Sequence, residues 1–440
     1  MLRKTVQEIA RFFGHEKNHQ KLVTSAAFDS QKVESGALFF AIQGNKKDGH
    51  DFLEDVAKKG GVAAVVSNTY KGPSFSLSLI PVADVRSALH ALAREIHQKN
   101  TSIVIAVSGS VGKTTTKEFI ATLLSEKYVV EQTPNNWNSQ LSLPLWLMNR
   151  KGGEEVLVLE MGMSFLGEIS RLVEIAPPNI GVLTSVDLAH AANFNSVNMI
   201  AQAKSELFSH PLTKIGFFHQ KTLDYNEIKE TICKKITYGE KGDYKLECVN
   251  KKGVVFEKNE NSPYFPLPFF EEHFLENFLG AAAVARYMDL SWEEIIKGSK
   301  RLKSSKHRFK RSVKRGVVCI DDSYNASPAS MKAALLALSL QSKKNKVIAV
   351  LGAMKELGEF SFQSHLEVGL FALQHIDHLL CLGRECQPMM DAFKEKKPAE
   401  LFTDLKLLKQ RLIKVVSKGD VVLIKGSNSL KMWTLLEAFE

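Results

Sequence analysis

The chain has no apolar run long enough to cross a membrane. Within its 440 residues, no continuous apolar stretch approaches the roughly 18–20 residues that a membrane-spanning helix requires. The first residues, Met1 to Glu8, also lack the apolar core that is typical of a secretory leader. We therefore expect a cytoplasmic protein without a membrane span.

Cysteine is scarce, and its spacing excludes two further classes of protein. The five cysteines are odd in number and contain no Cys-x-x-Cys pair, so neither a disulfide framework nor a zinc site is predicted. Low-complexity tracts and internal repeats are missing, and a hydrophobic content of 44% is that of a globular chain. The length predicts about two to four domains.

The net charge of +10 comes from one segment. Residues 297–315 hold ten Lys or Arg and no acid, and outside them the chain carries 48 basic and 48 acidic residues. Such a run is typical of a solvated connector, and it also suits contact with a polyanion such as a nucleoside triphosphate. A phosphate-loop ATPase that binds nucleic acid through this segment is an alternative, which predicts salt-sensitive binding.

Apolar runs alternate with helical patterns along the chain. In the first hundred residues, two apolar runs at 37–42 and 62–66 precede a helical face at 85–96, and a polar stretch at 97–101 follows. Runs at 103–107, 156–159 and 180–183 predict buried strands between helices, and therefore a doubly wound parallel sheet. The pattern restarts at Gly316, after an irregular, strand-rich stretch at 215–270. We predict three α/β domains at 1–97, 98–312 and 313–440.

The motif that points most directly to chemistry follows the run at 103–107. It reads Gly109-Ser110-Val111-Gly112-Lys113-Thr114-Thr115, between a β-branched strand and a helix. Backbone amides of such a glycine-rich turn cradle phosphates, the lysine neutralises the β- and γ-phosphate oxygens, and the first threonine hydroxyl contacts Mg²⁺. Val107 stands where a longer phosphate loop has its first glycine. The sequence predicts ATP or GTP binding.

Three further positions gain meaning beside this loop. Glu160 ends a predicted buried strand, and His190 follows the next strand at a similar offset, so both should emerge at the carboxyl edge of the sheet, where α/β proteins bind ligands. Mg²⁺ prefers oxygen ligands, which favours Glu160 over His190. The stretch 321–328, Asp-Asp-Ser-Tyr-Asn-Ala-Ser-Pro, either holds a ribose or cation or caps the following helix through Asp322 or Ser323.

The chain resembles the Mur ligases, the ATP-dependent family that builds the peptide of peptidoglycan precursors. Within the family it is most similar to the branch that joins D-alanyl-D-alanine to UDP-N-acetylmuramoyl-tripeptide. The segments that carry the resemblance are spread over all three predicted domains. They are 29–52, 108–118, 133–145, 159–169, the His190 segment, 201–208, 321–335, 351–359, His365 and 419–432.

The resemblance implies a fold and a reaction. It implies a three-domain Mur ligase architecture, with a central P-loop doubly wound parallel sheet and a C-terminal Rossmann-like α/β domain. The N-terminal domain would bind the UDP-sugar substrate. The tripeptide carboxylate would attack ATP to give an acyl phosphate, which the amine of D-alanyl-D-alanine would attack in turn. ATP, Mg²⁺ and these two substrates are the implied ligands of a monomer that binds no nucleic acid.

The same resemblance implies roles for individual residues. Lys113, Glu160, His190 and Lys204 match catalytic positions, and Lys204 falls where these ligases carry a carbamoylated lysine. The nucleotide contacts would be Gly109, Ser110, Val111, Gly112, Lys113, Thr114, Thr115, Asn277, Arg308 and Asp322. The metal ligands would be Thr114, Glu160, His190 and Lys204. The substrate contacts would be Ser30, Thr133, Asn136 and Asn138.

Several positions depart from the family pattern without removing a phosphate or metal position. They are Gln31, Asn135, 163–165, Phe274, Ala353 and Asn428. These departures indicate a diverged ligase. The alternatives to it are a sister Mur or folyl-polyglutamate-type ligase with another acceptor, the nucleic-acid-binding ATPase, and a nucleotide-binding protein without catalysis.

Overall fold

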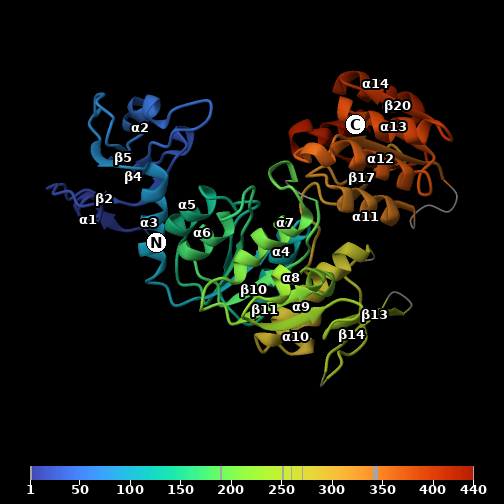
Figure 1. Ribbon diagram of the computed structural model, residues 1–440, viewed down its shortest axis with the longest axis horizontal. Coiled ribbons are helices and arrows are strands. Elements are labelled where there is room, and N and C mark those ends of the chain that lie inside the picture. The colour runs from blue at the N-terminus through green and yellow to red at the C-terminus, as the bar shows by residue number, and fades with distance from the viewer. Residues whose placement is uncertain are drawn as a thin grey trace.

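The computed structural model describes residues 2–188, 191–249, 252–258, 260–269, 271–339 and 345–439. Figure 1 shows three α/β units in chain order, with the N-terminal unit in blue on the left, the middle unit in the centre and the C-terminal unit in orange and red at the upper right. His190 lies outside the described residues. The domain boundaries at 97/98 and 312/313 stay predictions.

The N-terminal unit is built on a four-stranded parallel sheet with the order β3-β4-β5-β6. The helical face expected at 85–96 is confirmed, because Val85, Leu89, Leu92 and Ile96 are all buried on α3. Its strands are β1 (Lys4–Thr5), β2 (Leu22–Val23), β3 (Ser25–Ala27), β4 (Ala37–Phe40), β5 (Ala63–Ser67) and β6 (Ser78–Val82), and its helices are α1 (Val6–Phe12), α2 (Leu53–Lys58) and α3 (Val85–His97).

The middle unit contains a six-stranded sheet in which every neighbouring pair is parallel, with the order β12-β11-β10-β7-β9-β8. Aliphatic side chains fill the inner strands because helices cover both faces, as the continuous apolar runs predicted. The strands are β7 (Ile103–Ser108), β8 (Val130–Gln132), β9 (Val156–Glu160), β10 (Ile180–Leu183), β11 (Ile215–His219) and β12 (Lys234–Tyr238). The helices are α4 (Lys113–Leu124), α5 (Ser142–Asn149), α6 (Glu168–Ile175), α7 (Val197–Ser205), α8 (Asn226–Lys229), α9 (Glu272–Tyr287) and α10 (Trp292–Ser299).

The irregular stretch at 215–270 divides into two parts. Its first part supplies β11 and β12 of the parallel sheet, and its second part forms a separate antiparallel sheet of β13 (Lys245–Val249), β14 (Lys252–Phe256) and β15 (Phe265–Pro266). In Figure 1 this small sheet lies to the right of β10 and β11, on the side away from the N-terminal unit. It therefore lies apart from the strand ends that carry the phosphate loop.

The C-terminal unit has the strand order β16-β17-β21-β18-β19-β20, parallel except for the edge strand β16. The strands are β16 (Lys310–Lys314), β17 (Val317–Asp321), β18 (Val347–Gly352), β19 (His378–Leu382), β20 (Ala399–Phe402) and β21 (Val421–Lys425). The helices are α11 (Pro328–Ser339), α12 (Ser361–Ala372), α13 (Gln387–Lys394) and α14 (Leu405–Val415).

The basic segment 297–315 does not remain one continuous element. It covers the end of α10, a connector and the edge strand β16. Lys297 and Arg301 both form ion pairs with Glu126 of the middle unit, at 2.9 and 2.6 Å. Part of its charge is therefore used to attach this segment to the middle unit.

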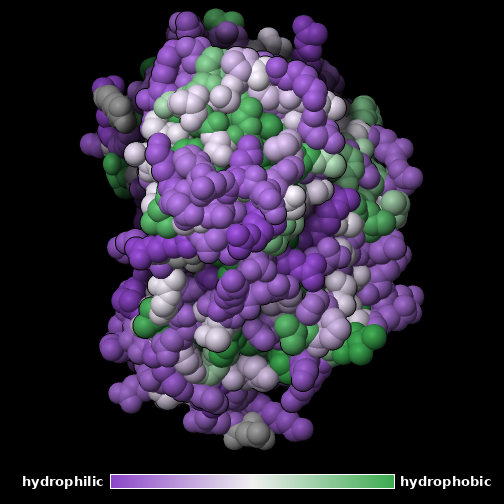
Figure 2. All heavy atoms as spheres, turned by 90° about the vertical axis from the view of Figure 1, so that its left-hand side faces the viewer, coloured by the Kyte–Doolittle hydropathy of each residue, from purple (hydrophilic) through white to green (hydrophobic). Residues whose placement is uncertain are grey.

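Among the described residues, no helix is long and apolar enough to cross a bilayer. Figure 2 shows the molecule from its N-terminal side, where hydrophilic side chains cover most of the surface and hydrophobic ones are scattered.

Candidate active site

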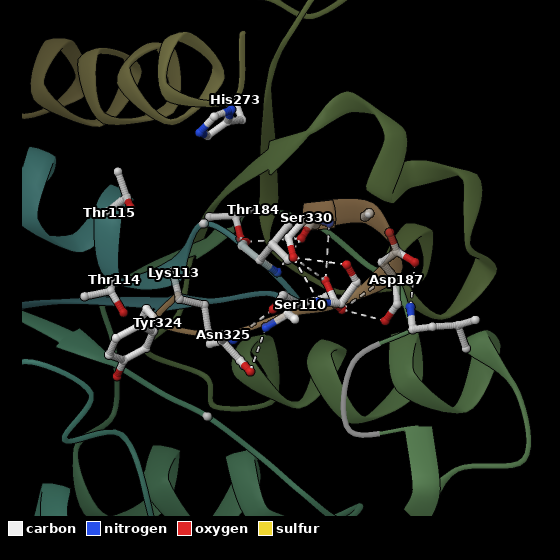
Figure 3. Close-up of a pocket in the computed structure, with 18 of the residues that line it drawn as sticks. Ser110, Lys113, Thr114, Thr115, Thr184, Asp187, His273, Tyr324, Asn325 and Ser330 are labelled. Carbon is white, nitrogen blue, oxygen red and sulfur yellow. Dashed lines mark hydrogen bonds between the residues drawn. The ribbon is translucent and has the colours of Figure 1, made fainter. Parts of the chain in front are cut away.

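A cavity of 1260 Å³ lies between the carboxyl ends of the middle sheet and the C-terminal unit. The phosphate loop, the end of β9 and the segment after β10 line it from the middle unit, and the segments around Asp322, Lys355 and Lys425 line it from the C-terminal unit. Arg86 of the N-terminal unit also reaches its wall. Figure 3 shows the phosphate-loop side chains opposite Tyr324 and Asn325.

The phosphate loop requires glycine at two positions. Gly109 and Gly112 have φ values of 151° and 84°, in the region that side chains disfavour. A Cβ on Gly109 would lie 2.0 Å from Thr184 Oγ1, and one on Gly112 would lie 2.5 Å from Asn277 Oδ1. Only glycine fits these two positions, and the tight turn that they allow leads into the N-terminus of α4. The dipole of that helix favours a phosphate at this end.

Lys113 turns back onto the loop that carries it. Its Nζ donates to the carbonyl oxygens of Gly109, at 2.7 Å, and Ser110, at 3.2 Å. Burial lowers the pKa of Lys113, and the Glu160 carboxylate opposes that effect. Phosphate oxygens are stronger acceptors for an ammonium than loop carbonyls, so a bound triphosphate would attract this side chain.

Glu160 is joined to the phosphate loop through a hydroxyl. The Thr114 hydroxyl donates to Glu160 Oε2 at 2.7 Å, and Asn138 Nδ2 donates to Glu160 Oε1 at 2.7 Å. Parallel pairing of β7 with β9 sets Glu160 beside Val107, directly before the loop. A carboxylate and a hydroxyl side by side next to a phosphate site fit the oxygen donors that Mg²⁺ takes from proteins.

A second lysine, Lys117, contacts the carboxylate of Glu160. Lys117 follows Lys113 by one helical turn, is fully buried, and has its Nζ 4.0 Å from Glu160 Oε2. Its Nζ also donates to the carbonyl oxygens of Thr133, at 2.5 Å, and Asn135, at 2.8 Å. Lys117 therefore links the carboxylate of Glu160 to the loop at 133–138.

Lys204 is buried on α7, and no described residue forms an ion pair with it. Its side chain is 3% exposed, and no described residue accepts a hydrogen bond from its Nζ. Burial, together with the nearby positive charge of Lys113, lowers the pKa of Lys204 well below its ordinary value. A lowered pKa favours the uncharged amine, which is the form that reacts with carbon dioxide.

Arg308 crosses from the basic segment to the phosphate loop. Its Nη2 donates to Thr114 Oγ1 at 3.0 Å, and its guanidinium lies 4.2 Å from the centre of the Tyr324 ring. This cation–π contact orients the guanidinium without satisfying its charge. Arg308 is thereby held beside the phosphate loop.

Asp322 is paired with a lysine that the sequence analysis did not select. Lys425 Nζ lies 2.6 Å from Asp322 Oδ2, and the Lys425 side chain is 3% exposed. Phe309 N also donates to Asp322 Oδ1 at 3.1 Å. Asp322 does not cap α11, because that helix begins six residues later at Pro328. The capping alternative for Asp322 and Ser323 is therefore wrong.

The expected site residues do not all meet in the cavity. Asn136, Asn138, Asn277, Thr115 and the phosphate-loop residues from 110 onward line it. Four of the predicted residues do not line it: Ser30, Gly109, Thr133 and Lys204. Ser30 lies on a short turn of the N-terminal unit, and Thr133 is buried and accepts a hydrogen bond from Glu160 N at 3.0 Å. His190 lies outside the described residues.

Three of the positions that depart from the family pattern can be explained by their local structure. Phe274 is buried against Phe269, with ring centres 4.8 Å apart, and Asn428 Nδ2 donates to the Tyr324 carbonyl at 3.1 Å. Asn135 adopts a φ of 46°, which asparagine tolerates better than most residues. Asn428 thus supports the segment that carries Tyr324.

Sequence reasoning missed Lys117, Tyr324 and Lys425 as site residues. The spacing of Lys117 from Lys113 places both on one face of α4, so a signal was present. Lys425 ends a buried strand, as Glu160 does, and that position also pointed to the carboxyl edge. Tyr324 gave no signal, because a tyrosine in a connector has many ordinary roles.

Comparisons with known proteins agree over the whole chain. Family models described as the Mur ligase family catalytic domain, the Mur ligase middle domain and the Mur ligase glutamate ligase domain match residues 22–97, 107–285 and 307–428. The UDP-N-acetylmuramoyl-tripeptide–D-alanyl-D-alanine ligase of Bacillus subtilis is 32% identical, over 98% of this chain and 97% of its own.

Solved structures give the same result. A crystal structure of MurF from Acinetobacter baumannii has a TM-score of 0.90 at 29% identity and covers 99% of this chain and 98% of its own. The MurF ligase from Thermotoga maritima in complex with ADP has a TM-score of 0.81 at 30% identity, over 95% of this chain and 97% of its own. The three-domain α/β architecture expected from the sequence is confirmed.

Proposed function

The chain belongs to the Mur ligase family, and we propose that it joins D-alanyl-D-alanine to the terminal carboxylate of UDP-N-acetylmuramoyl-tripeptide with hydrolysis of ATP. The observation that carries this proposal is full-length similarity to ligases of that name, together with a cavity that all three units line. The reaction belongs to peptidoglycan precursor synthesis in the cytoplasm. The protein acts as a monomer and binds no nucleic acid.

The reaction proceeds in two steps. The tripeptide carboxylate attacks the γ-phosphorus of ATP, which forms an acyl phosphate and releases ADP. The amine of the dipeptide then attacks the acyl carbon, an amide forms, and phosphate leaves with the electron pair of the broken C–O bond. Both steps gather negative oxygens in one place, so the protein contributes mainly positioning and charge neutralisation.

The residues of the middle unit would hold the triphosphate. The loop amides at 109–112 and the Lys113 ammonium bind the β- and γ-phosphates, and Thr115 continues this wall. Arg308 neutralises the γ-phosphate as it transfers, which its contact with Thr114 supports. Asn277 of the middle unit and Asp322 of the C-terminal unit contact the nucleoside.

Thr114 and Glu160 suit a first Mg²⁺ ion, with His190 and Lys204 as ligands of a second. When bound, Mg²⁺ neutralises phosphate oxygens and holds them in line for the attack. Lys204 takes part as its carbamate, in which the amine nitrogen is bonded to carbon dioxide and carries an anionic carboxylate. Its burial, with no hydrogen-bond acceptor among the described residues, supports this modification, because burial favours the uncharged amine from which the carbamate forms.

We expect the substrate contacts to run from the N-terminal unit to the loop at 133–138. Asn136 and Asn138 line the cavity wall that faces the tripeptide, whereas Ser30 lies on the N-terminal unit, where the UDP-sugar would bind. Lys32, on the same turn as Ser30, lies 5.8 Å from the centre of the Trp137 ring. This contact joins the UDP-sugar unit to the loop at 133–138, which Thr133 attaches to the backbone of Glu160.

A panel of acceptors tests the proposed function. Purified protein with ATP, Mg²⁺ and UDP-N-acetylmuramoyl-tripeptide should release phosphate with D-alanyl-D-alanine at least about tenfold faster than with glutamate, lysine or diaminopimelate, because the acceptor pocket must exclude the substrates of sister ligases. A single amino acid as the best acceptor would favour a sister ligase. ATP binding without phosphate release from any acceptor would favour a protein without catalysis.

Lys117 gives a prediction about magnesium. Lys117→Met removes the buried ammonium that contacts Glu160 and two loop carbonyls, so Glu160 loses its orientation. We expect about a tenfold to hundredfold lower kcat, and a higher Mg²⁺ concentration at half-maximal rate, as for other groups that orient metal ligands. Lys117→Arg keeps a cation and should recover part of the rate. An unchanged Mg²⁺ dependence in a less stable variant would limit Lys117 to a structural role.

The distribution of the site predicts domain closure. Phosphate-loop groups belong to the middle unit and Asp322 to the C-terminal unit, so the site is complete only when the two approach each other, with a hinge near 308–316. Small-angle X-ray scattering should show a smaller radius of gyration with ATP analogue and UDP-tripeptide than without ligands. An identical radius in both states would contradict the hinge.

A further inference from the structure

Asp187 is fixed beside the phosphate loop and has no role in the reaction described above. It follows β10, whose neighbour in the sheet is the strand that leads into the loop. The Ser110 hydroxyl donates to the Asp187 carbonyl at 2.8 Å, and Asp187 N donates to the same hydroxyl at 2.8 Å. The two contacts lock the position of Asp187 to the second residue of the loop.

The carboxylate of Asp187 lines the cavity with spare acceptor capacity. Its Oδ1 accepts from Leu188 N at 2.6 Å, and no Lys, Arg or His among the described residues forms an ion pair with it. Figure 3 shows Asp187 on the side of the cavity where α11 carries Ser330. Burial raises the pKa of Asp187, whereas Lys332 opposes that effect.

None of the described charged groups around Asp187 neutralises its carboxylate. Lys332 of α11 lies 3.0 Å from Glu367 of α12, so its ammonium is already paired. Tyr225, at the start of α8, is the other titratable neighbour, and the pKa of its hydroxyl is raised by burial. No described element packed here supplies an unpaired cation to Asp187. A cationic ligand group would fit this place.

Four other carboxylates of the cavity have hydrogen-bond or ion-pair partners. Glu160 accepts from Thr114 and Asn138, and Asp322 is paired with Lys425. Glu168 accepts from two backbone amides, and Glu276 contacts His219. Of the acids in direct contact with the phosphate-loop residues, Glu160 and Asp187, only Asp187 keeps an oxygen without a donor among the described residues.

The second step of the reaction needs such a group. An amino acid or dipeptide enters as an ammonium ion, which cannot attack a carbonyl until it loses a proton. The acyl phosphate forms at the phosphate loop, so the ammonium must be held within reach of that loop. We propose that Asp187 binds the ammonium of the incoming dipeptide and takes up its proton, an inference that rests on the proposed function.

The protons balance in this step. The ammonium gives one proton to the Asp187 carboxylate, and the uncharged amine attacks the acyl carbon. The nitrogen loses its second proton to the departing phosphate as the amide forms, and Asp187 returns its proton to solvent. The geometry thus assigns the middle unit two adjacent tasks, with Ser110 on the phosphate side and Asp187 on the amine side.

Asp187→Asn tests the proposal because it keeps the shape and removes the charge. We expect the KM for D-alanyl-D-alanine to rise at least about tenfold and kcat to fall by about 10²-fold, in the range for loss of a general base. The KM values for ATP and UDP-tripeptide should stay within about twofold, since those ligands do not contact this carboxylate.

Hydroxylamine separates the amine step from the acyl phosphate step. It is uncharged at neutral pH, so it needs neither an ammonium site nor a base to react with the acyl phosphate. Asp187→Asn should therefore form hydroxamate from UDP-tripeptide at the wild-type rate while it fails with the dipeptide. Asp224→Asn is the matched control, an exposed carboxylate on the same cavity without contact to the phosphate loop, and should behave as wild type with both acceptors.

Two results would overturn the role of Asp187. Wild-type kinetics with the dipeptide would show that its charge is not needed, and equal loss of hydroxamate and dipeptide product would assign it to the phosphate loop instead. If the wild-type protein uses a different amino acid, the proposed function is wrong. The same comparison then runs with that acceptor, because it too arrives as an ammonium.

Discussion

Lys113→Ala removes ligation and leaves the fold intact. The Lys113 ammonium turns back onto the carbonyls of Gly109 and Ser110, so it contributes little to the core and is free to move to a phosphate. Its loss leaves the β- and γ-phosphate charges without their nearest cation. We expect phosphate release to fall by about 10³-fold, as when a preorganised charge-stabilising group is deleted.

Phosphate release and thermal melting measure the two halves of this prediction. The matched control is Lys151→Ala, which removes an exposed lysine of the same unit and should leave turnover unchanged. The melting temperature of Lys113→Ala should match that of the wild type. Normal turnover in Lys113→Ala would mean that the phosphates bind elsewhere in the molecule. A large fall in melting temperature would mean that Lys113 is needed for the stability of the fold.

Lys204→Ala loses activity that a short carboxylate restores. Lys204 is buried beside Lys113 without an acceptor among the described residues, and burial lowers its pKa, which favours the uncharged, nucleophilic amine. We expect a carbamate there, so the alanine variant would lack an anion next to the phosphate loop. We expect a fall of about 10²–10³-fold, in the range for one electrostatic group.

Acetate or propionate should recover part of this activity by entering the space that alanine leaves. Lys113→Ala is the control. This variant lacks a positive charge, whereas Lys204→Ala would lack a negative one, so an added carboxylate should not restore the activity of Lys113→Ala. Lys204→Arg keeps a positive charge, cannot form the carbamate and should stay inactive. Wild-type rates in Lys204→Ala, or equal rescue of both alanine variants, would contradict the carbamate.

The sequence predicted the sheets better than the contacts between units. Continuous apolar runs such as 156–159 and 180–183 can be satisfied only by strands buried on both faces, so the parallel sheet and the emergence of Glu160 at its carboxyl edge followed directly. The phosphate loop followed from two glycines and a lysine at fixed spacing. Each of these signals is local in the chain.

The partners of those residues were not predictable, because they come from distant segments. Arg308 reaches Thr114 across 194 positions, and Lys425 reaches Asp322 across 103. Lys117 was overlooked because a helix lysine is usually exposed, and only the fold shows it buried against Glu160. The same holds for Asp187, which stands out only through its contact with Ser110 and its place in a cavity that distant segments of the chain line together.

The central claim is that one cavity couples ATP to amide formation between two specific substrates. The most direct test is the purified protein with ATP, Mg²⁺, UDP-N-acetylmuramoyl-tripeptide and D-alanyl-D-alanine, with phosphate and product mass measured together. We expect a UDP-N-acetylmuramoyl-pentapeptide product and one phosphate for each amide formed. Phosphate without pentapeptide, or no phosphate while ATP stays bound, would contradict it.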